Sequence, residues 1–92
     1  MTKKIAKTRR VQFEYNNNEA SSVFLVGDFN AWDRKKHEMK KNDDGTYRKT
    51  LMLSPKPYEY KFLVDGQWKK DPLNKMLSFN CFRKWNNVIY VH

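Results

Sequence analysis

The stretch from Tyr58 to Pro72, YEYKFLVDGQWKKDP, decides how this chain folds. From Tyr58 to Val64, aromatic and aliphatic residues alternate with mostly polar ones, which is the two-residue period of a half-buried strand. The dipeptide Asp65-Gly66 follows, and it favours a two-residue hairpin turn because both residues tolerate positive φ. The stretch therefore predicts a β-hairpin whose first strand carries an aromatic face.

The register of this hairpin predicts where Trp68 lies. With a two-residue turn, Leu63 pairs with Trp68 and Lys61 pairs with Lys70. Successive side chains alternate between the faces of a strand, so Trp68 lies opposite the aromatic ladder and diagonal to Lys61. A third turn residue would reverse the faces. An indole beside an ammonium group on the face away from the core calls for a functional explanation.

The composition is that of one globular, strand-rich domain. The chain has 92 residues, of which 39% are hydrophobic and 15% aromatic, enough for one modest core. No apolar run reaches membrane-spanning length, and the first residues lack the hydrophobic region of a signal peptide. We therefore expect a cytoplasmic protein with no membrane partner. The single cysteine, Cys81, permits neither an internal disulfide nor a cysteine-rich zinc site.

Basic residues gather at the N-terminus. The formal net charge is +9, and the first ten residues hold five of the 19 lysines and arginines and no acidic residue. We predict a basic flexible tail over residues 1–10 and a single domain over residues 11–92. Such a tail is either solvated or an arm that docks on an acidic partner.

The rest of the chain predicts further short strands separated by turns. Residues 22–26 are apolar on both faces, as in a central strand that is covered on both sides. Residues 73–83 show no clean period and predict an ordered loop whose side chains pack down. The other predicted strands are 11–15, 38–41, 46–53 and 87–91. About seven strands, with turn signals roughly every ten residues, predict an all-β, antiparallel β-sandwich.

The inventory of reactive side chains is too small for the common enzyme mechanisms. The chain has two histidines and one cysteine, and it has no glycine-rich phosphate loop, so it offers no nucleophile–base pair or metal cluster. Its aspartates lie at predicted turns rather than in a catalytic carboxylate pair. We expect no enzymatic activity, no metal and no cofactor.

Four motifs occur in a characteristic order: VFLVGDFNAWD at residues 23–33, DGTY at 44–47, the hairpin stretch, and NNVIYV at 86–91. Together they resemble carbohydrate-binding module family 48, over about residues 11 to 91. That family includes the glycogen-binding domains of AMP-activated kinase β subunits and the early-set domains of isoamylases and branching enzymes. The resemblance implies an immunoglobulin-like (early-set) sandwich that binds α-1,4-linked glucans such as glycogen, starch or malto-oligosaccharides.

The resemblance also implies a set of carbohydrate-binding residues. It places sugar-stacking tryptophans at Trp32 and Trp68. It places a hydroxyl-binding lysine at Lys61 and a hydroxyl-binding asparagine at Asn86. A pyranose has an apolar C–H face that aromatic rings cover, and hydroxyls that amide and ammonium groups satisfy. Since each polar contact contributes only about 1 kcal/mol, we expect a shallow site of roughly micromolar to millimolar affinity.

The loop before this asparagine contributes an apolar contact to the glucan in the family. Here the loop reads SFNCFRKW, is about one residue longer than in kinase β subunits, and lacks a glycine. The resemblance leaves the apolar role open between Phe82 and Trp85.

Two other functions stay open. Early-set domains often pack on an enzyme, which would make this chain a regulatory protein-interaction subunit. Because the sequence ends directly after its last predicted strand, we expect it to act alone or to dock in trans on a glucan-metabolising enzyme or kinase. The weaker alternative is single-stranded nucleic-acid binding, since Trp68 precedes two lysines and Trp85 follows an arginine and a lysine. A steep salt dependence would distinguish it from glucan binding.

Overall fold

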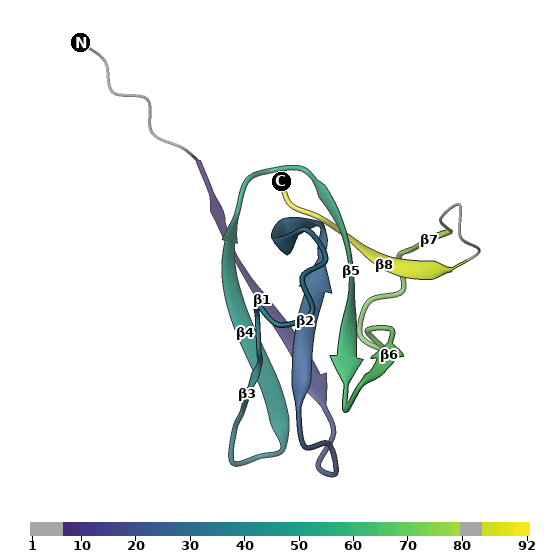
Figure 1. Ribbon diagram of the computed structural model, residues 1–92. Coiled ribbons are helices and arrows are strands. Elements are labelled where there is room, and N and C mark those ends of the chain that lie inside the picture. The colour runs from purple at the N-terminus through teal and green to yellow at the C-terminus, as the bar shows by residue number, and fades with distance from the viewer. Residues whose placement is uncertain (1–6, 80–83) are drawn as a thin grey trace.

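The computed structural model describes residues 7–79 and 84–92, which form mostly β-strands (Figure 1). The elements are β1 (Arg9–Asn16), β2 (Val23–Gly27), the 3-10 helix η1 (Asp28–Asn30), β3 (Lys40–Lys41), β4 (Thr46–Leu53), β5 (Pro57–Val64), β6 (Gln67–Lys69), β7 (Leu77–Phe79) and β8 (Trp85–Tyr90). Cys81 lies outside the described residues. In the described part of the chain, no helix is long and apolar enough to cross a membrane.

The strands form two antiparallel sheets. One sheet has three strands in the order β1-β4-β3, and the other has the order β2-β5-β8-β7, with β6 also paired to β5. The prediction of an all-β, antiparallel sandwich is confirmed, with eight described strands in place of about seven. β5 is the centre of the larger sheet because β2 pairs with one edge of it, and β8 and then β6 pair with the other.

The core fills the space between the sheets. Phe13 of β1, Leu25 of β2 and Phe62 of β5 are buried. Aromatic rings join the two sheets, with centroids 5.0 Å apart for Phe13 and Tyr60 and 5.1 Å apart for Tyr15 and Phe62. Each fully buried large apolar side chain contributes about 1.5–3 kcal/mol. The aromatic side chains predicted on one face of β5 thus face the core, and the opposite face of β5 is available for a binding site.

β2 is covered on both faces, as its sequence predicts. Val26, whose side chain points away from the core, is fully buried. Residues 37–39 also border the edge of β2 that faces away from β5: the Leu25 N–H donates to the His37 carbonyl at 2.9 Å, and the Met39 N–H donates to the Val23 carbonyl at 2.8 Å. The strand predicted over 38–41 is thus an isolated bridge at Glu38 followed by the two residues of β3.

The first strand begins earlier than the sequence predicts. β1 starts at Arg9, because Arg9 and Arg10 continue the antiparallel ladder opposite Leu53 and Met52. The Arg9 Nε also donates to the backbone carbonyl of His92 at 2.9 Å. The last two residues assigned to the basic tail are therefore part of the sandwich.

The prediction of a packed loop over residues 73–83 is wrong for its middle part. Residues Leu77–Phe79 form β7, which pairs with β8. Leu77 and Phe79 do not pack down and are exposed. The β7–β8 hairpin extends sideways beyond the three-stranded sheet (Figure 1). Three residues are too few for a period-2 pattern to show in the sequence.

Candidate functional site

The hairpin that carries Trp68 has the predicted geometry. Asp65 and Gly66 connect β5 to β6 with φ values of 48° and 83°, both positive as a two-residue type I′ turn requires. Leu63 pairs with Trp68. The indole therefore lies on the face opposite the core and is 42% exposed, which confirms the parity argument.

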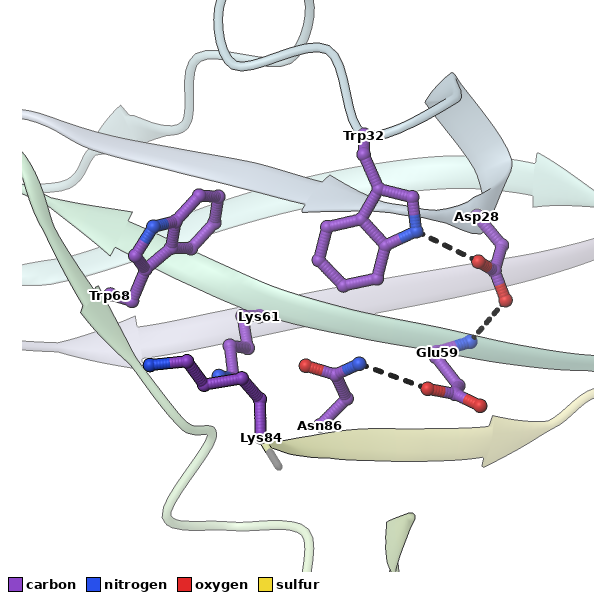
Figure 2. A pocket seen from close by; sticks show the side chains of 7 residues that line it. All are labelled: Asp28, Trp32, Glu59, Lys61, Trp68, Lys84 and Asn86. Carbon is purple, nitrogen blue, oxygen red and sulfur yellow. Dashed lines mark hydrogen bonds between the residues drawn. The ribbon is translucent and has the colours of Figure 1, made fainter. Parts of the chain in front are cut away.

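A groove of about 480 Å³ opens on this face of the larger sheet (Figure 2). Its lining residues come from η1 and the loop after it, from β5 and β6, and from the start of β8. They are Asp28, Trp32, Glu59, Lys61, Trp68, Lys84 and Asn86. Four of the residues implied by the family resemblance are thus brought together from separate parts of the chain, namely Trp32, Lys61, Trp68 and Asn86.

The two tryptophans form a bent aromatic surface at one side of the groove. The ring centroids of Trp32 and Trp68 are 6.3 Å apart, and the ring planes meet at 61°. The guanidinium carbon of Arg34 lies 5.6 Å from the centroid of Trp68, within cation–π range. The aromatic surface is therefore angled rather than flat, and a cation flanks it.

The backbone that presents Trp32 is in an unusual conformation. Ala31 and Trp32 have φ values of 55° and 59°, and two successive non-glycine residues in the left-handed region are strained. A backbone hydrogen bond from the Trp32 N–H to the Gly27 carbonyl, 2.9 Å long, holds the turn closed. Surrounding contacts must stabilise such a turn, and two polar side chains provide them.

The first of these side chains is Asn30, which is buried. Its Oδ1 accepts the Gly27 N–H at 3.1 Å, and its Nδ2 donates to the Leu25 carbonyl at 2.9 Å. Its Nδ2 also lies 2.9 Å from His37 Nδ1, so the imidazole accepts here and carries its proton on Nε2 when neutral. Asn30 thereby fastens the loop to β2 and to the segment that borders it.

The second side chain is Asp28, which connects the loop to β5. One carboxylate oxygen accepts the Trp32 Nε1–H at 2.9 Å, and the other accepts the Glu59 N–H at 2.8 Å. The chain of contacts continues to β8, because Asn86 Nδ2 donates to Glu59 Oε1 at 2.9 Å. Figure 2 shows this line of hydrogen bonds along one wall of the groove.

Asp28 and Glu59 are groove residues that the sequence analysis missed. Asp28 was interpreted as a turn aspartate, and its turn is real, but its side chain also orients an indole. Glu59 shares the parity of Lys61 on β5, so strand alternation places both on the same face. That parity was the available signal for Glu59, while Asp28 required the three-dimensional course of the loop.

Lys61 lies on β5 between the part of the strand that pairs with β8 and the part that pairs with β6. The predicted pairing of Lys61 with Lys70 is not part of the ladder, since β6 ends at Lys69. Burial lowers the pKa of the Lys61 ammonium from its usual range, and the positive charges of Lys84 and Lys70 lower it further. The floor of the groove therefore has a locally positive end.

The two neighbouring asparagines of β8 have different roles. Asn86 faces the groove, whereas Asn87 faces the core and is fully buried. The Asn87 Oδ1 accepts the Asp71 N–H at 2.6 Å, and its Nδ2 donates to the Asn74 carbonyl at 2.8 Å. Asn87 thus fixes the connection between β6 and β7, and Asn86 is left for a ligand.

The structure does not bring Trp85 to the groove. Trp85 pairs with Phe79 across the β7–β8 hairpin, with ring centroids 4.8 Å apart. By strand parity it shares the face of Asn87, opposite to Asn86. Trp85 therefore does not line the groove, and its apolar role in glucan contact stays a prediction. The alternative, Phe82, lies outside the described residues.

An open groove lined by two tryptophans and by amide, carboxylate and ammonium groups on a β-sandwich is typical of a carbohydrate-binding module. The chain belongs to the family described as the glycogen recognition site of AMP-activated protein kinase, whose profile matches residues 9–92. The resemblance drawn from the motifs is confirmed. This family is a carbohydrate-binding and not a catalytic domain.

Curated relatives come from plants and mammals. The chain is 40% identical to the chloroplastic protein PTST homolog 2 of Arabidopsis thaliana over 80% of this chain and 13% of that protein. It is 38% identical to the chloroplastic protein FLOURY ENDOSPERM 6 of Oryza sativa subsp. japonica over 97% of this chain and 16% of that protein.

A third relative is the human 5'-AMP-activated protein kinase subunit beta-2, 36% identical over 75% of this chain and 24% of that subunit. The chain thus spans less than a quarter of the length of these curated relatives.

Proposed function

We propose that this domain binds an α-1,4-linked glucan, such as glycogen, starch or a malto-oligosaccharide, without acting on it chemically. The observation that carries the proposal is the meeting of Trp32 and Trp68 above one groove, with Lys61 and Asn86 at its floor and wall. Family membership supports the same ligand class, because the matching profile describes a glycogen recognition site.

The angle between the indoles suits this ligand. An α-1,4 linkage makes a glucan chain curve, so two consecutive sugar rings present C–H faces that are tilted to one another. Two indole planes that meet at 61° match a curved chain better than a flat one. Asp28 orients the Trp32 ring before the ligand arrives, which lowers the ordering cost of binding.

The polar groups of the groove can satisfy sugar hydroxyls. The Asn86 Nδ2 is engaged with Glu59, which leaves its Oδ1 directed at the groove as an acceptor. The Lys61 ammonium is a donor. Each such bond contributes about 1 kcal/mol net, so stacking and a few hydrogen bonds correspond to roughly micromolar to millimolar affinity.

The test is isothermal titration of maltoheptaose into the protein and two tryptophan variants. We expect Trp68→Ala to weaken binding about five- to thirtyfold, because loss of one aromatic stacking contact corresponds to about 1–2 kcal/mol. Trp85→Ala is the matched control, since Trp85 is equally exposed but lies on the other face. Absence of binding at several millimolar sugar, or equal losses in both variants, would contradict the proposal.

A second function is favoured by a different surface. The rings of Phe79 and Trp85 contact one another at a tilt of 55° and the two residues are 52% and 47% exposed, and Leu77 extends the patch on the same side of the hairpin. Exposed apolar patches of this kind often contact proteins. The alternative function is therefore that of a regulatory subunit that docks in trans on a glucan-metabolising enzyme or kinase. We also propose that the whole protein has no enzymatic activity of its own.

A pull-down distinguishes the two functions. Capture of such an enzyme by the domain, unaffected by maltoheptaose and abolished in Trp85→Ala, would establish the docking function. Capture that requires sugar and persists in Trp85→Ala would attribute the association to shared glucan.

The cytoplasmic location stays a prediction, and fractionation of cells that express the full-length protein tests it.

A further inference from the structure

We propose that the groove prefers an α-glucan that carries a phosphate monoester, bound where Lys61, Lys70 and Lys84 converge. The inference rests on the proposed glucan binding and adds the chemical class of substituent that this site selects. It comes from the distribution of charge within the groove, which a neutral sugar leaves largely unused.

The two ends of the groove differ in charge. Asp28 and Glu59 lie toward one end, and Lys61 and Lys84 toward the other (Figure 2). Lys84 extends alongside Lys61, and Lys70 follows directly after β6, near enough for its charge to act on Lys61. Three lysines therefore contribute positive charge to this end of the groove.

The carboxylates of the groove do not neutralise this end. Both oxygens of Asp28 accept hydrogen bonds, from Trp32 and from the Glu59 backbone, and Glu59 Oε1 accepts from Asn86. Among the described residues, the recorded ion pairs join Arg48 to Glu14 and Asp44, and none involves Lys61 or Lys70. The positive end thus lacks an acidic partner within the described chain for two of its three lysines.

Mutual repulsion of the lysines supports the same conclusion. The charged neighbours that shift the pKa of Lys61 are Lys84 and Lys70, and both lower it. Binding of an anion reverses this repulsion, because an opposite charge favours the protonated ammonium. A sugar hydroxyl can accept a hydrogen bond from one lysine, but it is neutral and cannot offset the charge of three lysines.

A phosphate monoester fits this end in charge and in hydrogen bonding. It carries about −1.5 to −2 charge at pH 7 and has three strong acceptor oxygens. Charge-assisted hydrogen bonds are roughly twice as strong as neutral ones. With the glucan stacked on Trp32 and Trp68, a phosphate ester on a sugar at the lysine end would add a negative charge beside this group of lysines.

The experiment compares maltohexaose with maltohexaose phosphorylated on a C6 hydroxyl, by titration of the intact protein at low salt. We expect the phosphorylated sugar to bind about tenfold more tightly, a difference of about 1.4 kcal/mol. The preference should shrink at half-molar salt, since screening weakens exposed charge pairs. Stacking is insensitive to salt, so the affinity for the neutral sugar should barely change.

Three variants assign the preference to the lysines. Lys70 does not line the groove, so Lys70→Gln should leave neutral binding unchanged and reduce the preference about threefold. Lys70→Gln combined with Lys84→Gln should abolish the preference. The control is Lys40→Gln, an exposed lysine of β3 in the other sheet, which should leave the preference intact.

The outcomes separate this inference from the proposed function. Equal affinity for both sugars would overturn the phosphate preference and leave glucan binding in place. Failure of both sugars to bind would overturn both. Binding of a single-stranded oligonucleotide as tight as that of the phosphorylated sugar, with the same loss in the double variant, would reassign the lysines to nucleic acid.

Discussion

The two tryptophans of the groove are positioned by two regions that work by different principles. Trp68 lies on the β5–β6 hairpin, where the adjacent residues Asp65 and Gly66 set the turn and thereby the face of the indole. Trp32 lies in the loop after η1, where strained backbone is held by side chains that reach β2 and β5. The first arrangement is local in sequence, and the second is distributed.

The two tryptophans are therefore sensitive to different kinds of substitution. In the hairpin, a substitution in the turn should cost little stability and leave both the register and the sandwich intact. In the loop, substitutions at buried positions should affect the sandwich and Trp32 together, because the same hydrogen bonds serve both.

The largest effect is expected at Gly27, at the start of the loop. A Cβ at this position would lie 2.5 Å from the Glu59 carbonyl oxygen and 2.7 Å from the Tyr60 Cβ. Both neighbours belong to β5 and cannot give way without moving the central strand. We expect Gly27→Ala to lower the free energy of unfolding by about 3 kcal/mol, measured by urea denaturation. A loss below about 1 kcal/mol would mean that the loop and β5 separate easily.

Asn30→Ala should follow, because Asn30 makes its contacts from a buried position. The substitution leaves the buried Gly27 N–H and Leu25 carbonyl without their side-chain partner. An unsatisfied buried group costs about 1–3 kcal/mol, so we expect a loss of about 2 kcal/mol in unfolding free energy. Glucan affinity should fall as well, since Trp32 loses the support of its loop.

The matched control for this loop variant is Asp65→Ala in the hairpin. Asp65 accepts the N–H groups of Ser21 and Ser22 at 2.9 and 2.8 Å, but it is exposed, so water replaces the lost carboxylate. Urea denaturation should show a smaller loss of unfolding free energy for Asp65→Ala than for Asn30→Ala. Maltoheptaose titration should likewise show a smaller loss of affinity. An equal loss in both variants would remove the contrast between the two regions.

A smaller loss is expected from Gly66→Ala in the hairpin turn. Gly66 has φ +83°, and a Cβ there would meet no atom within 4 Å. The cost is therefore conformational and not steric, about 1 kcal/mol for a non-glycine residue in the left-handed region. Denaturation should show this small loss with retained maltoheptaose binding, since the register survives. Loss of binding would show that the turn also controls the position of Trp68.

These contrasts explain how much the sequence could predict. The face of Trp68 followed from alternation and a two-residue turn, both local rules that hold regardless of the rest of the chain. The placement of Trp32 beside it came from family resemblance alone. No pattern in GDFNAWD shows that Ala31 and Trp32 adopt positive φ, because that conformation depends on the distant partners Glu59 and His37.

The far end of the sheet was harder for a related reason. Trp85 was a candidate because the family's loop before Asn86 contributes an apolar contact to the glucan, yet one step along a strand reverses the face. β7 was missed because its three residues bury too little to pattern the sequence. Only the pairing with β8 identifies these three residues as a strand.

The smallest effect is expected at His37, whose titration acts on the loop and leaves the hairpin untouched. Burial lowers the pKa of its imidazole from the usual 6.5, Lys49 and Lys36 lower it further, and Asp33 opposes them. The unfolded chain therefore takes up this proton first as the pH falls, so the contribution of His37 to stability is complete above about 6.5 and declines below it. Protonation also places a proton on Nδ1, which then cannot accept from Asn30.

The urea midpoint should decrease between pH 7.5 and pH 5.5 in the wild-type chain and decrease less in His37→Gln. The same decrease in both proteins would assign the effect to other titrating groups. A decrease that is accompanied by weaker maltoheptaose binding would show that protonation of His37 also displaces Trp32, through the contact with Asn30.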